Sequence, residues 1–395
     1  MGWVDVVVDS YRDSECPAKF FYWSALASIS AVMRKSVFLD RFTYILYPNI
    51  YVFIVARSGM KKGIAVTLSK TLVSKAGNTR VISGRNSMPR IVQDLGKAYT
   101  TEQGGVIRDA QCYLVSGELG AFLVKDPDAL TVLTDLHDTH AHEDHWVNSL
   151  KGTGVDKLKA PCITLLGATN EEHFADAVPQ NAIGGGFIAR TFIVFSLDKG
   201  KLNSLMYRPS TVPDTAYLAE YLKELAKFSG QMQMTDMAKK AYDAWYYPFC
   251  GQDISDPTGT SNRIGDQILK VAMLLSLSES PSLEVKESHT VESIRVCTDC
   301  INGMKQVTMG AGKSNLASQT KIVMRELLMA PGNQIEHSKL LSRFWGDFDA
   351  FDLARIAETL ASAEAIEIIP HGRDFTYKMK KSALDMYQRT VRTIQ

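Results

Sequence analysis

Residues 50–63 read Ile50-Tyr-Val-Phe-Ile-Val-Ala-Arg-Ser-Gly-Met-Lys-Lys-Gly63, an apolar run followed by a short segment of small and basic residues. The run Ile50–Val55 is apolar without alternation, which is typical of a strand buried on both faces of a sheet. After Gly63, the apolar residues Ile64, Leu68 and Leu72 recur at helical spacing. The stretch therefore predicts a strand, a tight loop and a helix in direct succession.

A strand, a tight loop and a helix form the setting in which many proteins bind nucleotide phosphates. Backbone N–H groups at the helix N-terminus hold the phosphate oxygens, and a lysine neutralises the β- and γ-phosphates. Lys62 takes the place of that lysine, and Gly59 lies in the loop before it. The predicted phosphate-binding residues are Ser58, Gly59, Met60, Lys61, Lys62 and Gly63.

The loop departs from the G-x-x-x-x-G-K-[ST] pattern at three positions. Ala56 replaces the first glycine, Lys61 replaces the second, and Gly63 replaces the hydroxyl residue that would bind Mg²⁺. Ser58, or Thr67 one turn into the helix, would have to supply that hydroxyl instead. A structural turn with exposed lysines is the alternative interpretation, and the elements that follow favour phosphate binding.

Further apolar runs of strand length alternate with helical patterns along the chain. They are Arg80–Ser83, Cys112–Ser116, Cys162–Leu166 and Thr191–Phe195. Continuous apolar strands separated by helices indicate a largely parallel sheet covered on both faces. The predicted fold class is therefore α/β.

Polar residues mark the ends of three of these strands. Glu118 follows the second run, as in Walker B strands, where one carboxylate orders Mg²⁺ and the next polarises the attacking water. Gly117 stands where the first of those carboxylates would be, so Glu118 is the candidate for water activation. Asn170 follows the third run and could reach a γ-phosphate. Arg190 directly precedes the last strand, where it could serve a neighbouring subunit's nucleotide or form a structural ion pair.

The chain divides into four expected segments. Residues 1–45 are a helical N-terminal segment, and residues 46–200 are the core that contains the phosphate loop. Residues 201–316 are a helical lid, which ends in the Gly- and Ser-rich stretch Gly310–Asn315. Residues 317–395 form a C-terminal domain and tail.

The C-terminal domain has the layout of a winged helix. Helical patterns at Thr320–Met329, His337–Arg343 and Phe351–Ala363 precede the strands Ile366–Ile369 and Phe375–Met379, which flank a turn. Winged helices are frequent DNA-binding modules, but they also serve as protein contacts. The sequence leaves both interpretations open.

Composition sets limits on partners and location. A formal net charge of +1 gives no overall basic field, so any nucleic-acid surface must be local. The six cysteines are scattered, and the pair Cys297 and Cys300 has no second ligand pair nearby, which favours thiols over a zinc site. The most apolar stretch, Phe20–Met33, is too short to span a bilayer, and we find no secretory signal. We therefore expect a cytoplasmic protein without membrane contact.

Taken together, the chain resembles the primase/helicase-like P-loop ATPases of phages, plasmids and other mobile elements. It is more distantly similar to AAA+ helicases of the MCM type. The residues that carry the resemblance are Pro48-Asn-Ile-Tyr51, Ser58-Gly-Met-Lys-Lys62, Ser116-Gly-Glu-Leu-Gly120, Pro161-Cys-Ile-Thr-Leu-Leu-Gly-Ala-Thr169, Gly185-Gly-Phe-Ile-Ala-Arg190 and Ile268-Leu-Lys-Val-Ala-Met273. The resemblance covers most of residues 15–315 and implies an AAA+-like P-loop core with a helical lid and a C-terminal winged helix.

The resemblance also implies roles for residues outside the loop. Asn170 looks like a sensor-1 residue, Arg190 like an arginine finger, and Arg263 like the sensor-2 residue of a lid helix. The stretch 148–159 resembles a hairpin whose lysine grips a DNA phosphate in the central channel. Its candidate DNA-binding residues are Lys151, Lys157 and Lys159. A solvated charged hairpin is the alternative.

The function that the resemblance implies is an ATP- and Mg²⁺-dependent DNA helicase or translocase for replication of a phage or mobile element. Because an arginine finger cannot reach its own nucleotide, this function requires a homo-oligomer, and we expect a hexameric ring. A nucleotide-dependent DNA-binding scaffold or helicase loader with little turnover is the alternative, which the imperfect loop favours. A transcription regulator with an ATPase core is a third possibility.

Four histidines lie close together in the segment between Glu118 and the hairpin. They are His137, His140, His142 and His145, which are enough ligands for a metal ion. The surrounding residues are acidic and polar, which favours a solvated loop over a zinc site. We therefore predict no metal site formed by protein ligands alone.

Overall fold

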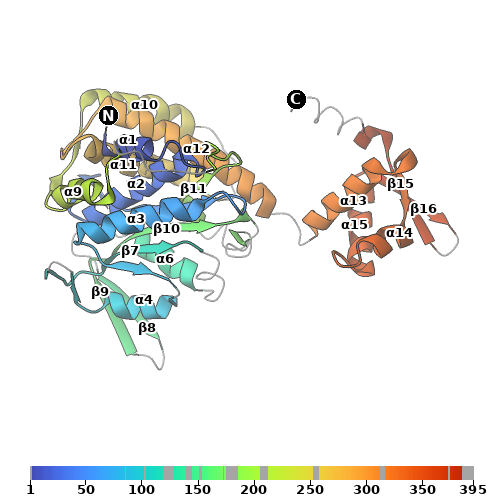
Figure 1. Ribbon diagram of the computed structural model, residues 1–395, viewed down its shortest axis with the longest axis horizontal. Helices are drawn as coiled ribbons and strands as arrows, with labels where there is room; N and C mark the ends of the chain where they lie inside the picture. The colour runs from blue at the N-terminus through green and yellow to red at the C-terminus, as the bar shows by residue number, and fades with distance from the viewer. Residues whose placement is uncertain are drawn as a thin grey trace. The chain divides into compact units, whose positions relative to one another are not determined.

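The five strands predicted from the sequence lie in one parallel sheet in the computed structural model of the protein (Figure 1). They are β3 (Tyr51–Val55), β4 (Val81–Ser83), β7 (Gln111–Ser116), β10 (Cys162–Thr169) and β11 (Thr191–Phe195). Their order across the sheet is β11-β3-β10-β7-β4, and every neighbouring pair is parallel. The prediction of an α/β fold with a parallel sheet is confirmed.

The structure describes residues 2–84, 86–101, 104–118, 128–138, 145–150, 154–171, 173–174, 186–204, 212–251, 258–311, 316–371 and 374–384. The chain forms two units, Met1–Ala311 and Gly312–Gln395.

Successive residues of each central strand face opposite sides of the sheet, and both sides are buried. In β3, Val52 and Ile54 belong to one hydrophobic cluster, whereas Tyr51, Phe53 and Val55 belong to a second one. This is why the run from residue 50 to 55 shows no alternation in the sequence.

Helices cover both faces of the sheet (Figure 1). The first cluster includes side chains from α1 (Trp3–Ser10), α2 (Ala18–Met33), α3 (Lys62–Ala76), α9 (Thr215–Leu225), α11 (Thr260–Glu279) and α12 (Glu287–Ala311). The second cluster includes side chains from α4 (Met88–Leu95) and α6 (Ala129–His137), and it also receives Met304 and Val307 of α12.

Helix α2 is buried on nearly all of its surface, as its continuous apolar sequence predicts. Two of its serines, Ser28 and Ser30, have hydrogen-bond partners inside the core. Ser28 Oγ lies 2.7 Å from Ser69 Oγ of α3, which in turn lies 2.7 Å from the Tyr113 hydroxyl of β7. Ser30 Oγ lies 2.7 Å from Thr164 Oγ1 of β10. These bonds satisfy buried hydroxyls and join α2 to the sheet.

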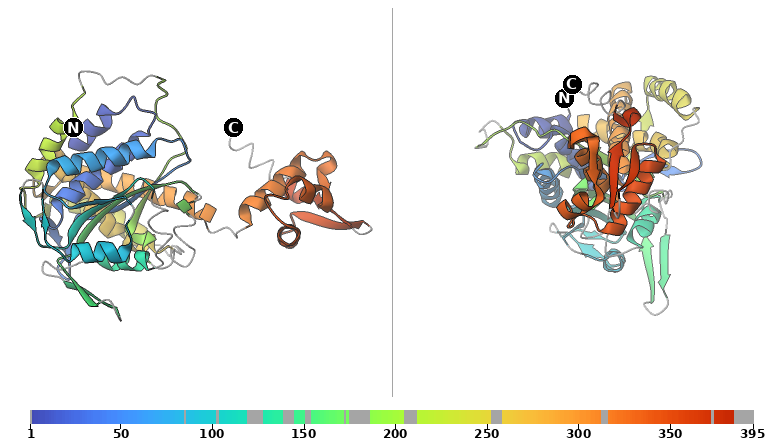
Figure 2. Two further views of the ribbon diagram at one scale, coloured as in Figure 1. Left: turned by 60° about the horizontal axis from the view of Figure 1, so that its bottom comes forward. Right: turned by 90° about the vertical axis from the view of Figure 1, so that its right-hand side faces the viewer.

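The first unit also carries shorter elements. They are β1 (Val37–Asp40), β2 (Ile45–Leu46), β5 (Tyr99–Thr100), β6 (Val106–Ile107), β8 (His145–Leu150), β9 (Gly154–Lys159), η1 (Ile188–Arg190), β12 (Gly230–Gln231), β13 (Gln233–Met234), α10 (Asp236–Cys250) and β14 (Glu284–Val285). Strands β8 and β9 form an antiparallel hairpin that projects from the sheet in Figures 1 and 2.

The three segments expected before residue 316 share one core. Phe20 of α2, Leu72 of α3 and Leu269 of α11 all lie in the first hydrophobic cluster. The boundary between units lies after Ala311, within the Gly- and Ser-rich stretch expected to be a linker. The segmentation by composition therefore marks changes of secondary structure within one folding unit, except at this boundary.

The second unit combines three helices with a three-stranded antiparallel sheet. Its elements are α13 (Ala317–Met329), η2 (Pro331–Asn333), β15 (Gln334–Glu336), α14 (His337–Arg343), α15 (Ala350–Ser362), β16 (Ile366–His371) and β17 (Asp374–Met379). The strand order is β15-β17-β16, around a core that includes Leu340, Leu353 and Tyr377. The predicted helices and hairpin are present, whereas β15 is too short to give a sequence pattern.

Among the described residues, no helix combines the length and the apolar character that a membrane span requires.

Candidate functional site

The loop after β3 contains two residues with positive φ angles. Gly59 has a φ of +85°, and Lys61, the residue before α3, has a φ of +55° in the left-handed region. Lys61 stands where the pattern places its second glycine, so a side-chain-bearing residue adopts the conformation that glycine usually supplies. Helix α3 then begins at Lys62, and its first N–H groups border the loop.

Lys62 folds back over this loop. Its Nζ donates to the carbonyl oxygen of Ala56 at 2.6 Å and to that of Arg57 at 3.0 Å. Partial burial lowers the pKa of Lys62, while the nearby carboxylates of Glu118 and Glu171 oppose that shift. The result is an ammonium group at the N-terminus of a helix, where a phosphate is favoured by both the charge and the helix dipole.

The ends of β7 and β10 lie beside the loop because β10 is between β3 and β7 in the sheet. Glu118 is exposed after β7, and its Oε1 accepts a hydrogen bond from His173 Nδ1 at 3.2 Å. The backbone N–H of His173 donates to Asn170 Oδ1 at 2.7 Å. The structure thus brings the predicted residues Glu118, Asn170 and Lys62 to one edge of the sheet.

Sequence reasoning missed two residues at this edge. His173 contacts the candidate catalytic carboxylate, and Glu171 Oε1 lies 3.8 Å from Arg57 Nε. Both follow Asn170 within three positions, and the polar run after the β10 strand was the available signal. Glu171 adds a second carboxylate near Lys62, although the described residues contain no group of three His, Cys, Asp or Glu side chains placed for a metal ion.

Two glycines stand where magnesium-binding side chains are expected. A Cβ atom built on Gly63 or on Gly117 would meet no atom of the described residues within 4 Å. Neither residue has a positive φ. Packing and backbone shape therefore do not require glycine at these two positions, and a hydroxyl at residue 63 or a carboxylate at residue 117 could be accommodated.

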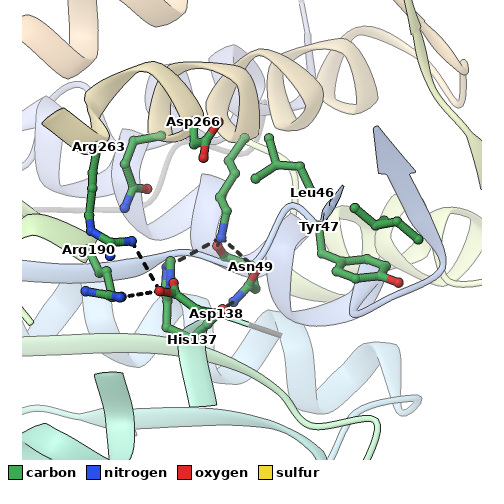
Figure 3. Close-up of a pocket in the computed structure, with 11 residues that line it drawn as sticks. Leu46, Tyr47, Asn49, His137, Asp138, Arg190, Arg263 and Asp266 are labelled. Carbon is green, nitrogen blue, oxygen red and sulfur yellow. Dashed lines mark hydrogen bonds and ion pairs between the residues drawn. The ribbon is translucent and has the colours of Figure 1, made fainter. Parts of the chain in front are cut away.

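A second polar cluster lies at the opposite, amino-terminal edge of the sheet (Figure 3). Asp138, just after α6, is its centre. Asp138 Oδ2 accepts hydrogen bonds from Arg190 Nη2 and, at 3.1 Å, from Arg263 Nη1. Arg190 Nη1 also donates to the carbonyl oxygen of Gly186 at 2.7 Å. Arg190 is only 7% exposed, whereas the Arg263 side chain is 46% exposed.

A group of buried polar side chains contacts Asp138 on the side away from the two arginines. His137 Nδ1 lies 2.9 Å from Asp138 Oδ1, and Lys270 Nζ lies 3.4 Å from His137 Nε2. Lys270 Nζ also donates to the backbone and side-chain oxygens of Asn49 at 3.0 and 2.8 Å. A carboxylate on one ring nitrogen and an ammonium on the other require a neutral His137 with its proton on Nδ1.

The pKa values at this edge follow from burial and charge. Burial and the Lys270 ammonium lower the pKa of His137 to about 3. Burial lowers the pKa of Lys270 to about 8. The pKa of Asp138 is held well below its usual range, because the hydrogen bonds from His137 and Arg190 outweigh the effect of burial. His137 is 5% exposed, so the predicted solvated loop does not include it. His140 and His142 lie outside the described residues.

A cavity of about 40 Å³ is enclosed by this cluster. Among its lining atoms, Gln267 Oε1 and Arg190 Nε are buried and have no hydrogen-bond partner among the described residues. The cavity is polar and large enough for water, which could bond to both atoms.

The two polar edges are separated by the length of β3. Five residues at about 3.3 Å each give a distance of about 17 Å. Arg190 and Arg263 therefore cannot contact a phosphate held by Lys62 of the same chain. The resemblance implied that Arg263 is a sensor-2 residue, which would make it part of the nucleotide-binding site, whereas the structure places Arg263 beside Arg190. In this conformation Arg190 is held within its own chain by Asp138.

The β8–β9 hairpin has one basic, exposed face. Lys157 and Lys159 are exposed on β9, and Val147, the partner of Lys157 on β8, is also exposed. Trp146 and Leu158 pair on the other face, against the second hydrophobic cluster. Lys159 Nζ lies 3.6 Å from Asp109 Oδ1. Lys151 lies outside the described residues.

No protein-family model matches the sequence, and a search of curated proteins finds no match to it. The geometry of the two edges and of the hairpin is therefore the basis for the function proposed below.

Proposed function

We propose that the protein binds ATP at the Lys62 edge of the sheet and hydrolyses it as an AAA+-like P-loop ATPase. The observation that carries this proposal is the junction of β3, the loop and α3. There the Lys62 ammonium donates hydrogen bonds to two loop carbonyls at a helix N-terminus. When ATP binds, its β- and γ-phosphate oxygens would take the place of these carbonyls as partners of the ammonium.

The catalytic roles follow from the strand order. Glu118 would orient the attacking water, and Asn170, just after the strand β10 that lies between β3 and β7, would contact the γ-phosphate. ATP would bring Mg²⁺ on its phosphates, with Glu118 and Glu171 as the carboxylates near that charge. Gly63 and Gly117 give the ion no side-chain ligand, so the phosphates and water would supply most of its shell.

The ATPase would use the energy of ATP hydrolysis to move along DNA, so the proposed activity is that of a helicase or translocase. The exposed face of the β8–β9 hairpin presents Lys157 and Lys159 beside apolar Val147, and of these two lysines Lys159 lies near Asp109. Such a face suits sequence-independent contact with phosphates and sugars. Arg190 and Arg263 lie across the sheet from Lys62, so an ATPase role for them requires a neighbouring copy in an oligomer such as a hexameric ring.

The second unit would act as a winged helix that contacts a protein partner. Its order of helices and hairpin matches that layout, and α15 would be the helix that enters a DNA groove. However, α15 carries Asp352 and Glu358 beside the single base Arg355, and Asp349 caps its start. Phe351 is 70% exposed at the same end. Acidic and aromatic groups favour a basic protein surface over DNA phosphate.

A nucleotide-dependent scaffold or helicase loader with little turnover is the second candidate. The absence of magnesium-binding side chains at residues 63 and 117 favours it, because nucleotide binding depends on Lys62 while fast hydrolysis depends on a well-ordered metal.

ATP turnover with and without single-stranded DNA separates these candidates. We expect DNA-stimulated turnover in the wild type that Glu118→Gln abolishes while ATP binding is kept. Lys62→Ala should abolish ATP binding. Its matched control is Lys70→Ala, because Lys70 is an exposed lysine on the same helix, two turns beyond Lys62. ATP binding without turnover in any condition would favour the scaffold, and no binding would contradict both candidates.

A further inference from the structure

One carboxylate, that of Asp138, holds both arginines at the amino-terminal edge. Arg190 and Arg263 come from segments more than 70 residues apart in the sequence, yet both donate to the same oxygen, Asp138 Oδ2 (Figure 3). Without this shared acceptor, the two guanidinium groups would repel each other at hydrogen-bond range. Asp138 thus fixes their separation and their direction.

The carboxylate of Asp138 is fixed by a buried chain of hydrogen bonds. His137 holds its other oxygen, Oδ1, and Lys270 of α11 holds the far side of the His137 ring. Lys270 also binds Asn49, directly before β3. This chain of hydrogen bonds connects α6, α11 and the start of β3. The positions of the two arginine side chains therefore depend on how helix α11 packs against the sheet.

Among the described residues that line the cavity, the cations outnumber the acids by one. Arg190, Arg263 and Lys270 face the acids Asp138 and Asp266, and Asp266 already accepts a hydrogen bond from the Tyr44 hydroxyl at 2.7 Å. Arg263 keeps nearly half of its side chain exposed. An exposed guanidinium beside this excess of positive charge among the described residues favours an anionic group of another molecule.

We propose that Asp138 is a positioning residue that holds Arg190 and Arg263 as a preformed pair for the nucleotide phosphates bound by the next copy of the chain. His137 and Lys270 fix Asp138 in turn. This inference rests on the proposed ATPase function. It adds the residues that hold the two arginines in position to contact the nucleotide of a neighbouring copy.

Subunit mixing tests this proposal directly. Lys62→Ala protomers lack a working loop but keep the amino-terminal edge, whereas Asp138→Asn protomers keep the loop. If Asp138 acts through the arginines in trans, both variants are inactive alone and regain turnover when mixed. At most about a quarter of the interfaces in an equal mixture join an intact loop to an intact edge, because the contacts are heterologous. Activity should therefore return to about a quarter of the wild-type value.

The matched control is a mixture of Asp138→Asn with Arg190→Ala. Both variants lack a competent arginine pair, so this mixture should stay inactive. Arg263→Ala, at the more exposed arginine, should behave as Asp138→Asn does in both mixtures. Asp138→Asn, Arg190→Ala and Arg263→Ala are first assayed for ATP binding at their own loops, which should equal that of the wild type.

Three results would overturn the proposal. They are recovery of turnover with Arg190→Ala, failure to recover with Lys62→Ala, and loss of ATP binding in Asp138→Asn, which would mean that the carboxylate maintains its own loop. If Lys62→Ala abolishes turnover but Asp138→Asn does not, this inference fails and the ATPase function stands. If the wild type has no turnover, both fail.

Discussion

The two edges of the central sheet carry similar residue types in opposite states. At the carboxyl-terminal edge, Lys62 is half-buried and donates to two loop carbonyls, and Glu118 is exposed beside His173. At the amino-terminal edge, Lys270 and His137 are buried and Asp138 is bonded by three side chains.

This difference is the one expected if the first edge is the ligand-binding site proposed above and the second edge is a preformed structural cluster. Groups that must exchange partners with a phosphate cannot be saturated in the free protein, whereas groups that only orient others gain from burial and full hydrogen bonding. We therefore expect substitutions at the first edge to change binding and turnover, and substitutions at the second edge to change stability as well.

The largest contrast is expected in stability. Lys270→Ala would leave a cavity and remove the partner of Asn49 and His137, at a cost of about 3 kcal/mol in the free energy of unfolding. Glu118→Gln, at the exposed edge, should change it by less than about 0.5 kcal/mol. Urea unfolding of both variants measures this contrast. Equal losses would contradict the assignment of the two edges.

Acid should destabilise the protein through His137. The unfolded pKa of histidine is about 6.5, and burial lowers the folded pKa of His137 to about 3. Between these values only the unfolded chain binds the proton, so stability falls as pH decreases from about 6.5, by up to about 1.4 kcal/mol per pH unit. His137→Gln should lose about 2 kcal/mol less than the wild type between pH 7 and pH 5. Identical pH profiles would mean that the pKa of His137 is the same in the folded and the unfolded protein.

Restoring the missing magnesium ligands should raise turnover. Gly63→Thr places a hydroxyl at the helix N-terminus, and Gly117→Asp places a carboxylate before Glu118, each in open space. We expect an increase of about tenfold in kcat for the double variant, which equals about 1.4 kcal/mol. The assay is ATP hydrolysis at varied Mg²⁺ concentration. Unchanged kcat and unchanged Mg²⁺ dependence would show that the ion does not approach these residues.

The smallest expected effect concerns DNA. Lys157→Ala should weaken binding to single-stranded DNA a few-fold and reduce the slope of log K against log salt by about 1. Arg355→Ala, on the acidic helix α15 of the second unit, should leave both unchanged. Fluorescence anisotropy at several salt concentrations measures them. A larger effect at Arg355 would place DNA on the second unit instead of the hairpin.

The sequence was sufficient to predict those helices and strands that a single local pattern of residues determines. The apolar runs located all five parallel strands, and the helical spacing located α13, α14 and α15 within a few residues. It also placed Lys62 and Glu118 at one edge, because the carboxyl ends of parallel strands meet there.

The amino-terminal edge was not predictable in the same way. Asp138 contacts Arg263 across 125 positions and Lys270 contacts Asn49 across 221, and such pairs depend on how α11 packs against the sheet. His137 was assigned to a solvated loop because its neighbours are acidic and polar, whereas it is the last residue of helix α6 and is buried. The helix period of residues 129–137 was the signal that could have revealed this.

The central claim is that the loop around Lys62 binds nucleotide phosphate, and equilibrium ATP binding tests it most directly. Isothermal titration of the wild type, Lys62→Ala and Lys70→Ala with ATP separates the loop lysine from a lysine elsewhere on α3. We predict saturable binding to the wild type and to Lys70→Ala, and at least a hundredfold loss in Lys62→Ala, equal to about 2.7 kcal/mol. Equal affinity of all three proteins, or no binding to the wild type, would contradict the account.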